Sequence, residues 1–377
     1  MTRITYIADT LFDGQTLHRQ CPLTVEDGRV VALGTGGARE IRLSGMLAPG
    51  FIDIQVNGGG GVLFNAEPSV ESIARIGAAH ARFGTTGFLP TLITDDAAIM
   101  GRAADAVAAA LAAQIPGVLG VHFEGPHLSV AKKGVHDPRF IRPLDDAEWA
   151  VLLRQDLGIR VVTLAPETVA PADIQRLVQA GVRVCLGHSN ADYETVMAAL
   201  DAGATGFTHL FNAMSPLESR APGMVGAALL DERSWCGLIV DGFHMHAASA
   251  RLALRAKARG KLLLVTDAMS PVGTDATEFE LFGVPVMRTG ERLHTANGTL
   301  AGSTLDMAGA VRNSVRELGV ELEEALRMAS RYPADFLGRS ANLGRLTEGA
   351  SADMVLLDDS QQVRATWIGG DTVYRAN

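Results

Sequence analysis

Short apolar, β-branched segments alternate with helical patterns through the middle of this 377-residue chain. The segments are residues 50–56, 86–93, 118–123, 160–164, 182–186, 206–210, 236–240 and 262–265. Most are followed by a stretch with helical periodicity, at 70–83, 97–113, 172–179, 193–202 and 247–259. Near-continuous apolar strands between helices are typical of parallel strands buried on both faces. The pattern predicts an α/β fold, a (β/α)₈ TIM barrel, with a doubly wound open sheet as the main alternative.

Both ends of the chain have a different, strand-rich pattern. Segments 4–8, 22–25 and 29–33 are separated by Asp-Gly pairs, and 353–357, 363–368 and 372–374 have the same character. Neither end is long enough to enclose a core alone, so we predict a small β-sandwich domain built from both termini. The expected domains are 1–47 plus 345–377 for the sandwich and 48–344 for the barrel. Residues 281–293 are expected to form a hairpin inserted after the eighth strand.

Composition excludes several classes of protein. Hydrophobic residues make up 47% of the chain and charged residues 20%, which is ordinary for a globular protein. The net charge of −9 disfavours non-specific nucleic-acid binding, and no apolar stretch is a convincing membrane span. The N-terminal segment lacks the apolar core of a signal peptide. Three scattered cysteines argue against a disulfide framework, so we expect a cytoplasmic protein.

Polar residues follow most of the predicted strands. In a (β/α)₈ barrel the chemistry lies where strands end, and buried carboxylates or imidazoles there are costly unless they are paired or bound to a metal. One such residue alone is more often a helix cap or a loop residue. Repetition around one rim predicts a site made from the residues that follow strands one, three, five, six, seven and eight: Gln55 and Asn57, Glu124, His188, His209, Asp241 with His244, and Asp267.

Three of these residues have the chemistry of metal ligands. Glu124, His188 and His209 suit Zn²⁺ or Fe²⁺ and would leave positions open for water or substrate, as a catalytic site requires. Asp267 could then take a proton from water and return it to a leaving group; the alternative is an N-cap. His122 either lines the barrel or supports the site. The loop that carries Lys132, Lys133 and His136 is either solvated or a lid over an anionic substrate.

Several motifs resemble those of the N-acetylglucosamine-6-phosphate deacetylases of the amidohydrolase superfamily, in the same order along nearly the whole chain. They are HFEGPH at 122–127, KKGVH at 132–136, LGHSN at 186–190, THLFNAM at 208–214, DGFH at 241–244, VTDAMSP at 265–271 and LAGS at 300–303. The resemblance implies hydrolysis of N-acetyl-D-glucosamine 6-phosphate to D-glucosamine 6-phosphate and acetate. It also implies a homodimer.

The resemblance further implies a role for individual residues. It assigns metal binding to Glu124, His188 and His209. It assigns proton transfer to Asp267, which acts first as general base and then as general acid. His136 polarises the acetyl carbonyl. The resemblance assigns contacts with the substrate or its phosphate to Asn212, Ala213, Arg220 and His244. It leaves open whether Arg220 serves its own site or that of the neighbouring subunit.

The segment Gln55-Val56-Asn57 bears on the number of metal ions. Many amidohydrolases have His-x-His at this position and hold two metals, whereas amides are poor Zn²⁺ ligands. We therefore expect one divalent ion per chain, with Zn²⁺ as the default and Fe²⁺ as the alternative.

Two other functions are weighed against this one. A hydrolase of another amide or a cyclic imide would lack the phosphate contacts of Arg220 and His244. A non-catalytic, amidohydrolase-like assembly protein would be expected to have lost metal ligands or Asp267, and all are present.

Overall fold

The structure is a computed structural model that describes residues 3–37 and 39–376. Its centre is a sheet of eight parallel strands in the order β15-β14-β13-β12-β11-β10-β9-β6. A parallel bridge between Val56 and Ala268 connects the first strand with the segment after the eighth. The strands are β6 (Phe51–Val56), β9 (Thr85–Ile93), β10 (Gly120–Glu124), β11 (Ile159–Leu164), β12 (Arg183–Leu186), β13 (Gly206–Phe207), β14 (Trp235–Leu238) and β15 (Leu262–Leu264).

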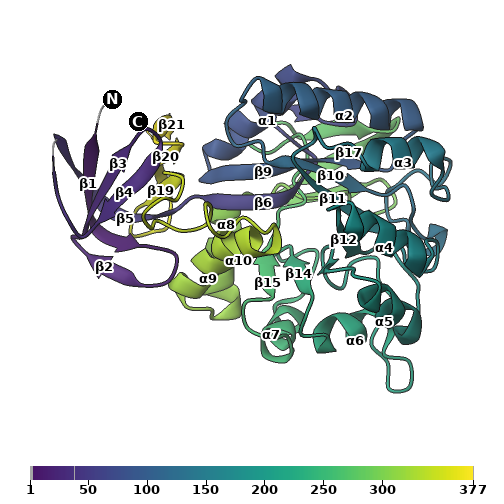
Figure 1. Cartoon of the computed structure of the whole chain (residues 1–377). Helices are drawn as coiled ribbons and strands as arrows, with labels where there is room; N and C mark the ends of the chain where they lie inside the picture. The colour runs from purple at the N-terminus through teal and green to yellow at the C-terminus, as the bar shows by residue number, and fades with distance from the viewer. Residues whose placement is uncertain (1–2, 38, 377) are drawn as a thin grey trace.

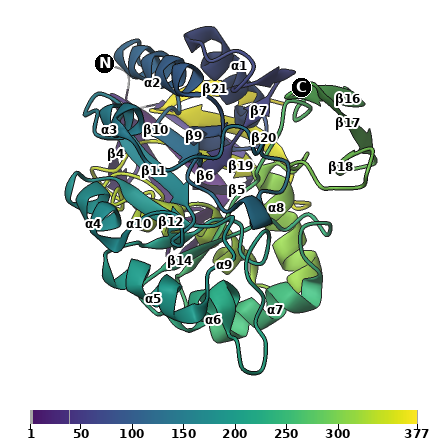
Figure 2. The same cartoon turned by 90° about the vertical axis from the view of Figure 1, so that its right-hand side faces the viewer.

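Helices surround these strands (Figure 2). The helices are α1 (Val70–Ala81), α2 (Ala97–Ala112), α3 (Asp146–Leu152), α4 (Pro171–Gln179), α5 (Tyr193–Asp201), α6 (Gly223–Leu230), α7 (Ala247–Ala256), α8 (Met307–Asn313), α9 (Leu322–Ala329) and α10 (Arg331–Phe336), with short helical turns η1 (Val130–Lys132) and η2 (Ser314–Leu318). Because helices cover the sheet, its strands are buried on both faces, which explains their nearly continuous apolar sequence. The predicted barrel is confirmed.

The two ends of the chain lie together in a second sheet beside the barrel (Figure 1). Its strands are β1 (Ile4–Phe12), β2 (Leu17–Arg19), β3 (Pro22–Glu26), β4 (Arg29–Leu33), β5 (Arg39–Pro49), β19 (Met354–Leu357), β20 (Val363–Ile368) and β21 (Asp371–Arg375). β5 pairs with N-terminal β1 on one side and with C-terminal β19 on the other. The buried side chains of this sheet, including Leu23, Leu47 and Trp367, form a core separate from that of the barrel.

Two small sheets lie near the carboxyl ends of the barrel strands. β7 (Gly58–Gly59) and β8 (Val62–Leu63) form one pair. The expected hairpin at 281–293 is a three-stranded antiparallel sheet of β16 (Glu278–Leu281), β17 (Val284–Thr289) and β18 (Arg292–Thr295). Its buried residues Leu281, Val286 and Leu293 pack with Met269, which lies just beyond β15. Among the described residues, no helix combines the length and apolarity needed to cross a bilayer.

Candidate active site

A cavity of about 240 Å³ opens where the barrel strands end. Of the nine residues to which the resemblance assigns a role, eight line this cavity and Arg220 does not. They are Glu124, His136, His188, His209, Asn212, Ala213, His244 and Asp267. A larger cavity of about 940 Å³ lies near the start of β15 and contains none of the predicted site residues. The chemistry of the lining side chains, and not volume, therefore identifies the candidate site.

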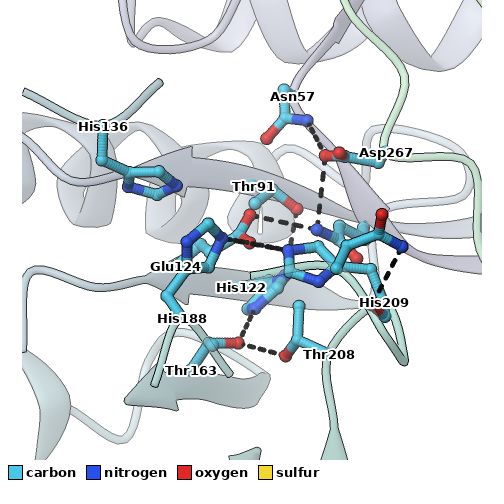
Figure 3. Close-up of polar contacts among 12 residues, drawn as sticks. Asn57, Thr91, His122, Glu124, His136, Thr163, His188, Thr208, His209 and Asp267 are labelled. Atoms are coloured by element: carbon cyan, nitrogen blue, oxygen red, sulfur yellow. Dashed lines mark hydrogen bonds and ion pairs between the residues drawn. The ribbon is translucent and has the colours of Figure 1, made fainter. Parts of the chain in front are cut away.

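Glu124, His188 and His209 converge in this cavity (Figure 3). Oε1 of Glu124 lies 3.2 Å from Nε2 of His188 and 3.0 Å from Nε2 of His209. The two Nε2 atoms are 3.0 Å apart. All three side chains are buried, with residue exposures of 2%, 6% and 4%. Among the described residues they form one group of potential metal ligands.

The proton on His188 provides a test of whether this group fits a cation. Nδ1 of His188 lies 2.9 Å from the carbonyl oxygen of Lys132, which can only accept, so Nδ1 is the nitrogen that carries the proton. When the ring carries this one proton, Nε2 presents a lone pair toward the carboxylate of Glu124. Two electron-pair donors in contact repel each other unless a positive charge lies between them. The donor set fits a divalent cation.

The electrostatics of the cluster favour positive charge beside an ionised carboxylate. Burial alone would raise the pKa of Glu124, but the adjacent imidazoles hold that pKa well below its usual range. Burial opposes protonation of His209, yet the carboxylate of Glu124 raises the pKa of this histidine. The cluster therefore keeps an ionised carboxylate and attracts positive charge.

The backbone at three of the strand ends adopts a conformation that is rare for residues other than glycine. The φ angles are +46° at His188, +33° at His209 and +53° at Asp267. Hydrogen bonds hold these turns: the backbone N–H of Asp267 donates to Gln55, and its carbonyl accepts from the N–H of Ser303. Such strain is found at functional sites, where the surrounding structure enforces it. Here it turns the side chains into the cavity as each strand ends.

The carboxylate of Asp267 is held by two amides. Nδ2 of Asn57 donates to Oδ1 of Asp267 at 2.6 Å, and Nε2 of Gln55 lies 3.3 Å from the same oxygen. Nε2 of Gln55 also donates to Oε2 of Glu124 at 3.1 Å. Burial, together with the nearby charge of Glu124, raises the pKa of Asp267 to about 6. A group with this pKa can both take and give a proton near neutral pH.

His136 reaches the cavity from the loop that follows β10. The residue is 3% exposed, and its ring lies against that of His188, with ring centroids 4.4 Å apart. Burial and the neighbouring His188 hold the pKa of His136 well below its usual value, so the ring is neutral. Gly134 and Val135 of the same loop also line the cavity. This part of the loop is a wall of the site.

The predicted substrate contacts divide into two groups. Asn212, Ala213 and His244 line the cavity, and Nδ1 of His244 lies 2.6 Å from Oδ2 of Asp241. Arg220 is exposed in the loop between β13 and α6 and does not line the cavity of its own chain. A single chain thus brings together every residue to which the resemblance assigns a role, except Arg220.

The structure adds one contact that the sequence did not indicate, and it decides between the two interpretations of His122. Thr94, directly after β9, contacts the ring of His136, and it occupies a strand-end position of the kind that predicted the other residues. His122 does not line the cavity. It lies inside the barrel in a chain of buried hydrogen bonds with Thr91 and Thr163, and Thr163 in turn contacts Thr208 (Figure 3).

Comparisons with known proteins agree with this geometry. Residues 46–373 match the amidohydrolase family. An N-acetylgalactosamine-6-phosphate deacetylase from Shewanella sp. (strain ANA-3) is 53% identical over 96% of this chain and 93% of the relative. The structure of N-acetylglucosamine-6-phosphate deacetylase from Pasteurella multocida superposes with a TM-score of 0.95 at 34% identity, covering 100% of both chains.

A further structural relative was solved with a ligand. It is a mutant of N-acetyl-D-glucosamine-6-phosphate deacetylase from Mycobacterium smegmatis in complex with N-acetyl-D-glucosamine-6-phosphate. Its TM-score is 0.92 at 34% identity, covering 99% of this chain and 100% of the other. With a family match that spans most of the chain and a barrel whose strand ends carry the Glu/His/His cluster, this chain belongs to the amidohydrolase family.

Proposed function

We propose that this chain is a metal-dependent deacetylase that hydrolyses N-acetyl-D-glucosamine 6-phosphate to D-glucosamine 6-phosphate and acetate. The observation that carries the proposal is the placement of Glu124, His188 and His209 in one cavity with Asp267. The C4 epimer, N-acetyl-D-galactosamine 6-phosphate, is the second candidate substrate. The relative at 53% identity, whose name specifies the galactosamine sugar, favours this candidate.

Glu124, His188 and His209 would hold one divalent ion, with Zn²⁺ as the first candidate and Fe²⁺ as the second. When bound, such an ion supplies Lewis acidity, which polarises a carbonyl oxygen and makes a water more acidic. The carbonyl of Lys132 fixes the orientation and tautomer of His188, as partners of metal-binding imidazoles generally do.

Asp267 would carry both proton transfers. Its carboxylate takes a proton from the water that attacks the acetyl carbon, and it returns the proton to the sugar nitrogen as the C–N bond breaks. An amine is a poor leaving group unless it is protonated, so the second transfer matters as much as the first. The amides of Asn57 and Gln55 keep the carboxylate in place for both steps.

His136 would donate a hydrogen bond to the acetyl oxygen and stabilise the negative charge that develops there. The buried, neutral ring is well suited to this role because a donor in a water-poor site acts strongly on a developing charge. Asn212 and Ala213 would contact the sugar from the same cavity wall.

The 6-phosphate would be bound by His244 and by Arg220 of the second subunit of a homodimer. Arg220 has no hydrogen-bond or ion-pair partner within the described part of its own chain and is exposed. Leu217 in the same loop and Phe243 beside His244 are 51% and 44% exposed, as residues covered by a partner subunit would be in an isolated chain. A guanidinium suits bidentate phosphate binding. The three free thiols fit a cytoplasmic location.

Mixed dimers test the placement of Arg220. Arg220→Ala and Asp267→Asn are each expected to be impaired alone. If Arg220 serves the partner's site, a mixed dimer has one site with both defects and one with neither, so mixing the subunits restores activity. Mixed dimers that stay as impaired as the separate variants would show that Arg220 acts in its own chain or elsewhere.

Acetate release tests the proposed function. The zinc-loaded protein is assayed with both phosphorylated epimers, with unphosphorylated N-acetylglucosamine, and with a cyclic imide. We expect kcat/KM to be highest for a phosphorylated N-acetylhexosamine, and the ratio of the two epimers then decides between the candidates. Preference for the imide or for the unphosphorylated sugar would contradict the proposal.

A further inference from the structure

Thr94 makes the side-chain hydrogen bond to the ring of His136. Its Oγ1 lies 2.8 Å from Nδ1 of His136, and both residues are buried, with exposures of 1% and 3%. Within the described residues, no other side chain forms a hydrogen bond with this ring. Whatever fixes the proton on His136 must therefore act through Thr94.

The direction of this hydrogen bond decides what His136 offers to a substrate. A neutral imidazole carries one N–H, so one ring nitrogen donates and the other accepts. If Nδ1 donates to Thr94, then Nε2 is a bare lone pair and cannot bind a carbonyl oxygen. If the hydroxyl of Thr94 donates to Nδ1, then Nε2 carries the proton and can donate.

Distances favour the second arrangement. The single hydroxyl proton of Thr94 has two acceptors: Nδ1 of His136 at 2.8 Å and the backbone oxygen of Glu124 at 3.2 Å. Hydrogen bonds from hydroxyls to oxygen usually span about 2.5–3.0 Å, so the contact with Glu124 is long and the contact with His136 is well placed. We propose that Thr94 is a positioning residue whose hydroxyl donates to Nδ1 of His136 and thereby fixes the tautomer that presents Nε2–H to the acetyl oxygen.

The chain leaves space for this hydroxyl at a glycine. A Cβ atom at Gly125 would lie 2.2 Å from Oγ1 of Thr94, and the φ of Gly125 is +91°, a conformation that other residues rarely adopt. Gly125 directly follows the predicted metal ligand Glu124, and any side chain at this position would collide with the Thr94 hydroxyl. The role assigned to Thr94 rests on the proposed function, because a donor at Nε2 is useful only if a carbonyl is polarised there.

Three variants separate this role from a structural one. Thr94→Val removes the hydroxyl and keeps the shape, whereas Thr94→Ser keeps the hydroxyl. Thr85→Val is the matched control, because Oγ1 of Thr85 is buried on β9, the strand that precedes Thr94, and has no hydrogen-bond partner among the described residues. We expect Thr94→Val to lower kcat by roughly 10- to 100-fold, as loss of a partner that orients a functional histidine does. KM and the metal content should change little.

For the serine variant and the control, we expect kcat to stay close to that of the wild type. Thr94→Ser should recover most of the wild-type kcat, and Thr85→Val should match the wild type. Wild-type kcat in metal-loaded Thr94→Val, or equal losses in Thr94→Val and Thr94→Ser, would overturn the proposal.

The tautomer can also be observed without turnover. In ¹⁵N-histidine-labelled, zinc-loaded wild-type protein, two-bond ¹H–¹⁵N correlations show which ring nitrogen carries the proton, and His136→Gln identifies the signal of His136. We expect the proton on Nε2, and a proton on Nδ1 would overturn the proposal even if the threonine variants failed to fold. Failure of the proposed function would be seen separately, as absence of acetate release by the wild type.

Discussion

Nδ2 of Asn57 donates a hydrogen bond to Oδ1 of Asp267 across 2.6 Å. This contact joins the end of the first barrel strand to the end of the eighth, beside the bridge between Val56 and Ala268. Gln55 extends the connection to Glu124. The amides thus hold two carboxylates in place at the position where a second metal would need imidazole ligands.

The first prediction concerns metal content. The amide N–H groups of Gln55 and Asn57 donate to Glu124 and Asp267. Because amides are poor ligands for a second metal, we expect one tightly bound ion per chain. Elemental analysis of protein reconstituted with excess zinc and then desalted measures this number. Two retained ions per chain, both required for activity, would contradict the prediction.

The second prediction concerns Asp267→Asn. The asparagine keeps the size of the side chain and an oxygen that can accept from Asn57, but it cannot carry a proton. We expect the variant to fold and bind substrate, with kcat lowered by roughly 10²–10⁴-fold, the usual contribution of a general acid–base group. Metal content is measured alongside as the control. Near wild-type turnover by the metal-loaded variant would show that Asp267 does not carry the proton.

The third prediction concerns Arg220→Ala. A charge-assisted hydrogen bond contributes roughly 1.5–3 kcal/mol, which is about 10- to 150-fold at ~1.4 kcal/mol per decade. We expect a loss of that order in kcat/KM for the phosphorylated sugar and little change for the unphosphorylated sugar. Arg102→Ala, at an exposed position on α2, is the matched control and should match the wild type for both sugars. Equal losses on both sugars would mean that Arg220 supports the fold or the catalytic centre instead.

The fourth prediction concerns stability in acid. Burial lowers the pKa of His80 to about 4, from an ordinary value near 6.5, and Nε2 of His80 lies 2.9 Å from the carbonyl oxygen of Gly58. As pH falls below about 6.5 the unfolded chain binds a proton that the native protein excludes, so stability falls until pH reaches about 4.

The variant His80→Gln removes this titration and keeps a donor for Gly58. Between pH 6.5 and 4 the free energy of unfolding of the wild type should fall by up to about 3 kcal/mol more than that of the variant. Urea unfolding at several pH values measures the difference. A difference that does not change with pH would show that His80 is not the group responsible.

The sequence predicted most of the barrel because each strand is buried on both faces and is therefore continuously apolar. Helix α6 was not predicted, since seven of its eight residues, Gly223 to Leu229, are buried and it lacks the polar face that marks most surface helices. β13 ends at Phe207, earlier than the expected residue 210, because the positive φ of His209 breaks the strand. That turn depends on contacts between strands, which no local pattern reveals.

The sequence also predicted most residues of the candidate site, but not all of their contacts. Residue type and strand-end position brought Glu124, His188 and Asp267 into one group, because parallel strands end at the same rim. Arg220 could not be placed in this way, since its position depends on an exposed loop. The contact between Thr94 and His136 was also missed, because a threonine after a strand is common and only the folded chain shows which ring it faces.

Acetate release measured together with metal content tests the central claim most directly. The protein is freed of metal with a chelator, reloaded with one equivalent of zinc, and assayed with N-acetyl-D-glucosamine 6-phosphate and its C4 epimer at each stage. We expect activity to be lost with the metal, to return in proportion to zinc bound up to one ion per chain, and to require the 6-phosphate for efficient turnover. No acetate release from either phosphorylated sugar by the zinc-loaded protein, or undiminished release by the metal-free protein, would contradict the account.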